Sequence, residues 1–307
     1  FLVPGQGSQH AGMGSLAAQA YPESREIFEA ADRALGFSIS RLCFEGPEEV
    51  LKLTENTQPA ILATSVALHR ALSARGIEPD FVAGHSLGEY TALVAAGALR
   101  LADALVLVRQ RGRYMQEAVP VGEGAMAAIL GLSSEQVLEV CRDAAEGEVV
   151  EPANLNGAGQ VVIAGHTGAV SRATALAKER GARRTLPLPV SAPFHCRLME
   201  PAARKLVRDL ESVVFSDLCV PLLTNVDAAP IRDGHKAREA LRRQVASPVR
   251  WEESVIKLAE SGVSRFLEVG PGKVLSGLVR KIRKDARVWS VDGPDAVATV
   301  LEDMADG

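Results

Sequence analysis

The pattern of apolar residues predicts short buried strands that alternate with longer amphipathic helices. Four apolar runs have the length of a buried strand: residues 1–3, 80–83, 220–225 and 266–269. Between residues 23 and 35 the apolar positions recur at helical spacing, which places Ile27, Phe28 and Ala31 on one face together with Leu35. Such alternation predicts a parallel sheet that helices cover on both faces.

Two further helices are expected in the first 120 residues, one on each side of the predicted strand at residues 80–83. One should run from Pro59 to about Arg75, because proline suits the first turn of a helix and Gly76 can end it. The other should run from Leu101 to about Ala118.

Residues 124–190 follow a different rhythm. A strand near residues 125–130 precedes a helix capped at Ser133, and a hairpin turns around residues 156–159. A helix over 167–180 and a strand over 184–190 complete the order βαββαβ, the ferredoxin-like pattern. We therefore expect a ferredoxin-like subdomain at 124–190, inserted into a core made of residues 1–123 and 191–307.

Composition and charge narrow the class of protein. The 307 residues are 47% hydrophobic and 23% charged, which is typical of a globular chain with a large core. The net charge of −4 makes nucleic-acid binding through a basic surface an unfavourable hypothesis. The chain has no apolar run of about 18 residues, so we expect no membrane span.

The cysteines and the start of the chain bear on its location. Four cysteines lie far apart, without a CxxC pair, which predicts reduced thiols in a cytoplasmic protein and no zinc site: Cys43, Cys141, Cys196 and Cys219. Phe1 begins inside an apolar run, so either the sequence starts within a strand or a few residues precede it. No export signal is visible in the residues given.

The clearest chemical motif is the run from Gly84 to Gly88. It reads Gly-His-Ser-Leu-Gly and lies between a predicted strand and a predicted helix, the setting of a nucleophile elbow. This arrangement exposes the hydroxyl of Ser86 and aims the backbone N–H of Leu87 at a developing oxyanion. It also makes the predicted parallel-sheet core similar to that of the α/β-hydrolases.

A serine nucleophile needs a base, and His195 fits best because it follows the serine in chain order on a loop after a strand. His69 lies within a helix and His85 on the elbow, so both are expected to have packing roles. The remaining histidines are expected at the surface: His10, His166 and His235.

No aspartate or glutamate lies at a strand end between Ser86 and His195. Asp103 and Asp143 lie in predicted helices, and Glu151 is a weak candidate. We therefore predict a Ser–His dyad in which a backbone carbonyl or a side-chain amide orients the imidazole.

Two more segments change the chemical interpretation. The loop at residues 4–9 lacks the third glycine of a nucleotide-binding loop, so its Gln6 is better interpreted as the second N–H donor of an oxyanion hole. Arg111 lies on an otherwise apolar helix, where either a solvated charge or a ligand contact is plausible from the residues alone.

Five motifs together resemble the malonyl-CoA:acyl carrier protein transacylases, a family related to the acyltransferase domains of polyketide synthases. They are residues 4–9, 84–90, 111–116, 193–195 and 268–272, and they span nearly the whole chain. The resemblance implies that Ser86 carries a malonyl ester and that His195 is the general base and acid. It also implies that Arg111 binds the malonyl carboxylate and that the backbone carbonyl of Gln244 orients the histidine.

The implied reaction moves a malonyl group from malonyl-CoA to the phosphopantetheine thiol of an acyl carrier protein, with no cofactor and no metal. Phe194 is similar to the malonyl-selecting version of this loop. Basic residues at 280–284 and 242–243 are candidate contacts for an acidic carrier protein. Three alternatives remain: a trans-acting polyketide synthase acyltransferase, a serine thioesterase or hydrolase, and a carrier-binding scaffold with an inert Ser86.

Overall fold

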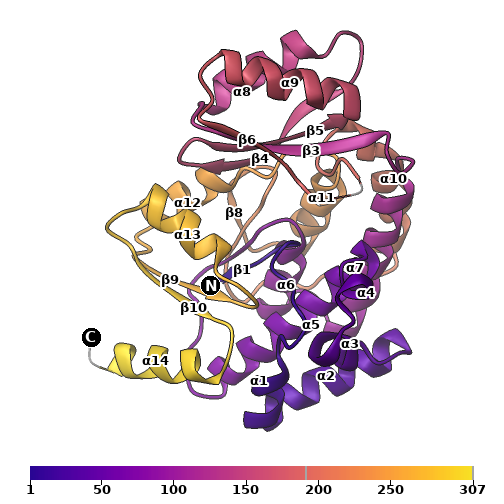
Figure 1. Cartoon of the computed structure of the whole chain (residues 1–307). Coiled ribbons are helices and arrows are strands. Elements are labelled where there is room, and N and C mark those ends of the chain that lie inside the picture. Colours follow the sequence, from indigo (N-terminus) through magenta and orange to yellow (C-terminus); the bar gives the residue numbers. More distant parts are fainter. Residues whose placement is uncertain (191, 306–307) are drawn as a thin grey trace.

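Two β-sheets organise the chain (Figure 1). This computed structural model describes residues 1–190 and 192–305, so Ser191 and residues 306–307, which the sequence analysis assigns to the core, lie outside the described residues. The larger sheet has the strand order β10-β9-β1-β2-β7-β8. Its strands are β1 (Leu2–Val3), β2 (Val82–Gly84), β7 (Leu222–Leu223), β8 (Pro230–Ile231), β9 (Arg265–Val269) and β10 (Arg287–Val291).

All neighbouring pairs in this sheet are parallel except the β7–β8 edge pair. Successive side chains of a strand point to opposite faces. On one face Leu2, Ala83 and Leu223 join the apolar cluster of α12 (Trp251–Glu260) and α13 (Val274–Ile282). Their neighbours Val3, Val82 and Leu222 join the helices of the other face. The prediction of a parallel sheet covered on both faces is confirmed.

The remaining helices of the core pack around this sheet. They are α1 (Ser15–Ala20), α2 (Pro22–Leu35), α3 (Ile39–Glu45), α4 (Glu48–Leu51), α5 (Thr54–Ser73), α6 (Leu87–Ala95), α7 (Leu101–Glu117), the short 3-10 helix η1 (Arg197–Met199), α10 (Glu200–Glu211), α11 (Gly234–Gln244) and α14 (Pro294–Ala305).

The predicted start of the helix at Pro59 is wrong. Helix α5 begins five residues earlier, at Thr54, and Pro59 lies inside it. The side chains of Asn56 and Thr57 bind the carbonyls of Val50 and Leu51, which fixes the extra turn onto the preceding helix. Local proline preference is a weaker constraint than these buried hydrogen bonds.

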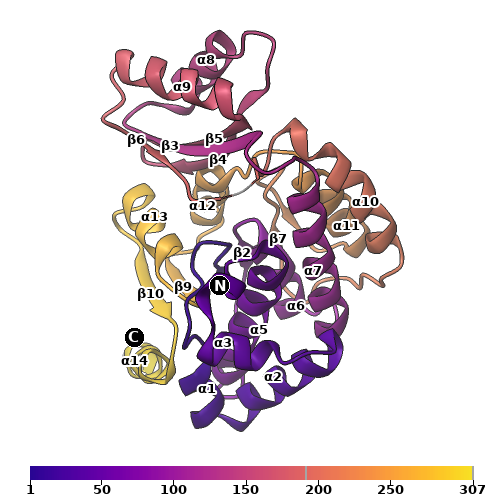
Figure 2. The same ribbon diagram turned by 45° about the vertical axis from the view of Figure 1, so that its right-hand side comes forward.

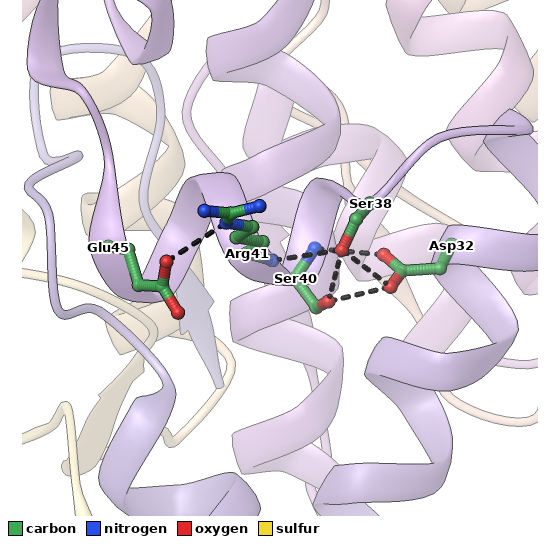
Figure 3. A network of polar contacts seen from close by, with 5 residues as sticks. All are labelled: Asp32, Ser38, Ser40, Arg41 and Glu45. Carbon is green, nitrogen blue, oxygen red and sulfur yellow. Dashed lines mark hydrogen bonds and ion pairs between the residues drawn. The ribbon is translucent and has the colours of Figure 1, made fainter.

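The junction between α2 and α3 shows how side chains end one helix and begin the next (Figure 3). Asp32 accepts hydrogen bonds from the Ser38 and Ser40 hydroxyls and from the Ser40 backbone N–H. Ser38 is the N-cap of α3 and accepts from the N–H of Arg41. These bonds satisfy donors that a helix start leaves free.

The second sheet has the strand order β4-β5-β3-β6 and is antiparallel throughout. Its elements are β3 (Gly124–Leu130), α8 (Ser134–Ala144), β4 (Val150–Gly157), β5 (Gln160–His166), α9 (Thr167–Glu179) and β6 (Arg184–Pro187). Helices α8 and α9 lie on the side of this sheet that faces away from the rest of the chain (Figure 2). The expected order βαββαβ is present, and Ser133 caps α8 with a capping box. The fold class, a parallel-sheet core with an inserted ferredoxin-like unit, is confirmed.

Strand β6 ends at Pro187 and is shorter than the predicted strand 184–190. Leu188 still donates its backbone N–H to the carbonyl of Met126, and Pro189, which follows, has no N–H to continue the ladder. The second sheet is joined to the core where β4 contacts the segment before α12. Leu155 donates its backbone N–H to the carbonyl of Val249, and Val249 donates to Ala153. The ferredoxin-like unit is thereby fixed above the carboxyl ends of the parallel strands.

Residues 1–190 and 192–305 contain neither a candidate membrane span nor a disulfide. None of their helices is both long and apolar enough to cross a membrane. All four cysteines are free thiols, with Cys219 exposed and the other three buried.

Candidate active site

The Gly84–Gly88 segment forms a tight turn between β2 and α6. Ser86 has φ 54° and ψ −106°, a backbone conformation that is costly for a residue other than glycine. A Cβ atom on Gly84 would lie 1.9 Å from the carbonyl carbon of Gly88, and one on Gly88 would lie 2.1 Å from the carbonyl oxygen of Val3. Both glycines are therefore required for strand and helix to approach.

Asn225, which follows β7, holds this turn from outside. Its Oδ1 accepts the backbone N–H of Ser86 at 2.7 Å, and its Nδ2 donates to the carbonyl of Gly84 at 2.6 Å. Strands β2 and β7 are parallel neighbours, so their carboxyl ends lie at the same edge of the sheet. One side chain thus fixes the backbone on both sides of His85.

Ser86 and His195 come together although 109 positions separate them. The Oγ of Ser86 lies 2.6 Å from Nε2 of His195. Nδ1 of the imidazole faces two carbonyls, those of Gln244 at 3.0 Å and Ser247 at 3.2 Å. Carbonyls only accept, so Nδ1 carries the proton of the neutral ring and Nε2 is free to accept the proton of Ser86.

The imidazole of His195 is held neutral by its surroundings. Burial, and then the nearby guanidinium of Arg111, lower the pKa of His195 to about 3. The two carbonyls act in the opposite direction but do not outweigh burial. Above acidic pH the ring is therefore a neutral base beside a hydroxyl.

Arg111 projects from α7 into the same site and is only 1% exposed. Its Nη2 donates to Ser86 Oγ at 3.0 Å and to Gln244 Oε1 at 3.0 Å, and its Nη1 donates to Gln58 Oε1 at 2.8 Å. Its Nε has no hydrogen-bond partner, and no carboxylate among the described residues pairs with it. A buried cation held only by neutral oxygens retains its attraction for an anion.

Gln244 binds the site through its side chain as well as its carbonyl. Nε2 donates to the carbonyl of Ser86 at 2.9 Å and to Glu89 Oε2 at 2.7 Å. Glu89 is fully buried on the first turn of α6, and burial raises its pKa to about 7. The network joins α6, α7 and α11 behind the serine.

Gln6 and Leu87 lie in the same cavity as Ser86, Arg111 and His195. This cavity has a volume of about 100 Å³, and its other walls are His85, Met115, Met126, Asn154, Leu188, Val190 and Phe194. Leu87 is the first residue of α6, where a backbone N–H has no partner within the helix. A Cβ atom on Gly5 would lie 2.5 Å from the carbonyl of His85, so the Gln6 loop packs directly against the turn.

Comparisons with known proteins identify the family of this chain. Residues 1–300 match the model of the acyl transferase domain family. This chain belongs to that family. It is 48% identical over 307 residues to the malonyl CoA-acyl carrier protein transacylase of Bacillus subtilis (strain 168), covering 100% of this chain and 97% of that protein. It is 50% identical over 303 residues to the protein of the same name from Escherichia coli (strain K12), covering 98% of each.

A solved structure of a malonyl-transacylase in complex with a type II PKS acyl-carrier protein superposes with a TM-score of 0.96. It is 46% identical and covers 98% of both chains. Membership of the acyl transferase family therefore rests on sequence and on structure alike.

Sequence reasoning missed several residues of this acyl transferase site. Glu89 and Asn225 stand inside runs that the sequence analysis assigned to a helix and to a strand, and Gln58 stands at a predicted helix start. Their common signal is a polar side chain within an apolar segment, which is typical of a satisfied buried network.

The other candidates have structural surroundings. His85 Nε2 donates to Asn156 Oδ1 of β4 at 2.9 Å, and His69 is buried on α5. His10 and His235 are exposed and His166 is half-buried. Arg109 lies over the ring of Phe37, and Arg113 is exposed beside Glu55. Among the described residues, no three His, Cys, Asp or Glu side chains gather where they could hold a metal ion.

The buried histidines predict that the protein loses stability in acid. Burial lowers the pKa of His69 to about 4 and of His195 to about 3, whereas the unfolded chain has about 6.5. Their contribution is complete above about pH 6.5 and is lost as the pH falls. Glu89 acts oppositely, since its raised pKa favours the folded state as pH falls from 7 towards 4.5.

Burial lowers the pKa of His85 in the same direction, so three histidines act against the buried carboxyls of Glu89 and Glu268. We therefore expect the melting temperature to fall between pH 6.5 and 5, and to fall less for His69→Leu, which removes one of the three imidazoles. A melting temperature that rises on acidification would contradict this assignment.

Proposed function

We propose that this protein transfers a malonyl group from malonyl-CoA to the phosphopantetheine thiol of an acyl carrier protein, through a malonyl ester on Ser86. The observation that carries the proposal is the buried Arg111 guanidinium, which donates to Ser86 Oγ and lacks a carboxylate partner among the described residues. A substrate that presents a reacting carbonyl to Ser86 and a carboxylate to Arg111 suits this pair of groups. The same substrates are supported by the names of two relatives that match this chain over nearly its whole length.

In the first half-reaction, Ser86 Oγ attacks the thioester carbonyl while its proton passes to His195 Nε2. The C–S bond then breaks, and His195 returns the proton to the sulfur of coenzyme A. In the second half-reaction the carrier thiol attacks the serine ester. His195 takes the thiol proton and gives it to Ser86 Oγ as the C–O bond breaks, so the enzyme is regenerated.

The backbone N–H groups of Gln6 and Leu87 are proposed to stabilise the oxyanion of both tetrahedral intermediates. Leu87 contributes a free helix N-terminal N–H, which favours negative charge. Gln6 lies in the loop that packs against the turn, within reach of the same cavity. Gln244 is proposed to orient His195 through its carbonyl, which takes the place of a triad carboxylate.

These steps use only side-chain and backbone groups of this chain and the two substrates, so we propose that no cofactor and no metal is needed. We also propose a cytoplasmic location, and a division into a core of residues 1–123 and 191–307 and a subdomain of residues 124–190. We further propose that the malonyl carrier protein formed in this reaction supplies fatty acid synthesis. A trans-acting polyketide synthase acyltransferase is the second candidate, since the related complex contains a PKS carrier protein and the chemistry is the same.

The malonyl ester gives the direct test. After mixing with malonyl-CoA, we expect intact-protein mass spectrometry to show one added malonyl group on the parent protein and none on Ser86→Ala. Ser133→Ala, which changes the exposed N-cap of α8 in the ferredoxin-like unit, should retain the adduct. An unmodified parent protein would refute the transferase, and release of free malonate without a carrier would favour the hydrolase.

Arg111 is expected to select for the acyl carboxylate. Removing it in Arg111→Ala should lower kcat/KM for malonyl-CoA about a hundredfold and that for acetyl-CoA much less, because hydrogen bonds to charged groups contribute about 1.5–3 kcal/mol each. Arg113→Ala, an exposed residue two positions along α7, is the matched control. Equal losses with both acyl donors would argue against this role.

The basic residues at the C-terminal end of α13 are the better candidates for contact with an acidic carrier. Lys281 and Lys284 are exposed and pair with no acid among the described residues, whereas Arg242 and Arg243 pair with Glu239 and Asp227. An unpaired surface charge is available to a partner.

We expect Lys281→Glu to raise the KM for carrier protein about fivefold, as a change of about 1 kcal/mol in a rim charge does, and to leave the KM for malonyl-CoA unchanged. The control is Lys178→Glu, which changes an exposed lysine on α9, the helix on the side of the second sheet that faces away from the core. Equal effects on both substrates would rule out docking at this surface.

A further inference from the structure

Glu89 is a buried carboxyl group to which the proposed reaction assigns no role. It is the third residue of α6, three positions after Ser86, and none of its surface is exposed. Oε2 accepts from Gln244 Nε2 at 2.7 Å and from the backbone N–H of Asn225 at 3.2 Å. Oε1 has no hydrogen-bond partner among the described residues.

These bonds fix which way the Gln244 amide points. Its two N–H donors are used by Glu89 Oε2 and by the carbonyl of Ser86, so its oxygen must face Arg111. A flipped amide would place an NH₂ group against the guanidinium and an oxygen against a carboxylate. Glu89 therefore sets the orientation of the one side chain that links it to Arg111.

The charges around Glu89 come from several elements. Arg111 of α7 is the nearest buried cation, and Tyr90 is its neighbour on α6. Asp227, after β7, raises the pKa of Glu89 and is itself paired through two hydrogen bonds with Arg243 on α11. His195 is neutral. The site thus holds one buried cation and one buried acid with an amide between them.

A carboxylate that binds Arg111 would bring a second negative charge towards Glu89. Like charges in a buried site disfavour double ionisation, so the acid would take a proton from solvent. The proton would go to Oε1, since Oε2 already accepts two donors. The pKa of Glu89, raised by burial to about 7, allows this exchange near neutral pH.

We propose that Glu89 is a positioning residue that determines specificity: through Gln244 it holds Arg111 ready for an acyl carboxylate, and it takes up one proton when that carboxylate binds. This rests on the proposed function, because it concerns the carboxylate of the transferred acyl group. Glu89 bonds to Ser86 only through its backbone N–H, and its carboxyl group acts through Gln244 and Arg111.

The test compares malonyl-CoA with acetyl-CoA, which has the same coenzyme but no acyl carboxylate. The ratio of their kcat/KM values is measured between pH 6 and 8.5, so that titration of the coenzyme cancels. We expect the parent ratio to fall severalfold as pH rises through 7. In Glu89→Gln, whose amide oxygen can still accept from Gln244 and Asn225, the ratio should not change with pH.

Glu89→Ala removes the anchor of Gln244, so its ratio at pH 6 should drop about tenfold. If Glu89→Ala lowers kcat/KM for malonyl-CoA and for acetyl-CoA by the same factor, Glu89 is merely structural and the proposal fails. If the parent ratio is as flat with pH as that of Glu89→Gln, proton uptake is refuted. Should Glu89→Ala fail to fold, Glu89→Gln still decides.

Proton uptake can also be measured without turnover. Malonyl-CoA binding to Ser86→Ala is followed by calorimetry at pH 7 in two buffers of different ionisation enthalpy, with acetyl-CoA as the blank. We expect net proton uptake with malonyl-CoA that disappears in Ser86→Ala/Glu89→Gln. A parent protein that forms no malonyl ester would instead refute the proposed function, which separates the two failures.

Discussion

The burial of Arg111 is the constraint on which the rest of the site depends. Taking a guanidinium out of water costs several kcal/mol unless other groups replace its hydration. In this chain the replacements are oxygens of Gln58, Gln244 and Ser86, all of them neutral. The cation is thereby kept in place without being neutralised by contact, which leaves it able to attract a carboxylate.

A second constraint is the strained backbone of Ser86. A conformation of this kind costs on the order of 1–3 kcal/mol and persists only when the surroundings fix it. Asn225 supplies two hydrogen bonds to the turn, and Gln244 supplies a third to the carbonyl of Ser86. The same Gln244 also supports His195 through its backbone, so the nucleophile, the base and the cation share one support.

The architecture explains why these groups can meet. The turn, the Gln6 loop and Asn225 all follow parallel strands and lie at one edge of the larger sheet, while the ferredoxin-like unit closes the cavity from above with Met126 and Asn154. His195 lies on the chain that returns from that unit to the core. The cavity is small, with a volume of about 100 Å³, and a transferase must keep water away from its acyl ester.

Local sequence was enough for the groups that define the chemistry. The glycines around Ser86 are needed for steric reasons, so the turn can be predicted from five consecutive residues, and the order βαββαβ follows from periodicity within 67 positions of the chain. Chain order and loop position pointed to His195 and Gln6, and the resemblance to a known family then implied the roles of Arg111 and Gln244.

Only the tertiary structure revealed Glu89, Asn225 and Gln58 as partners of these residues. Their hydrogen bonds join elements that lie far apart in the chain, as between Gln244 and Glu89 across 155 positions, and no periodicity records such a pairing. The early start of α5 has the same origin, because contacts with the preceding helix outweigh the preference of Pro59. Sequence thus determined which groups react, and packing decided which buried polar groups hold them, since a buried hydrogen bond depends on where two distant segments meet.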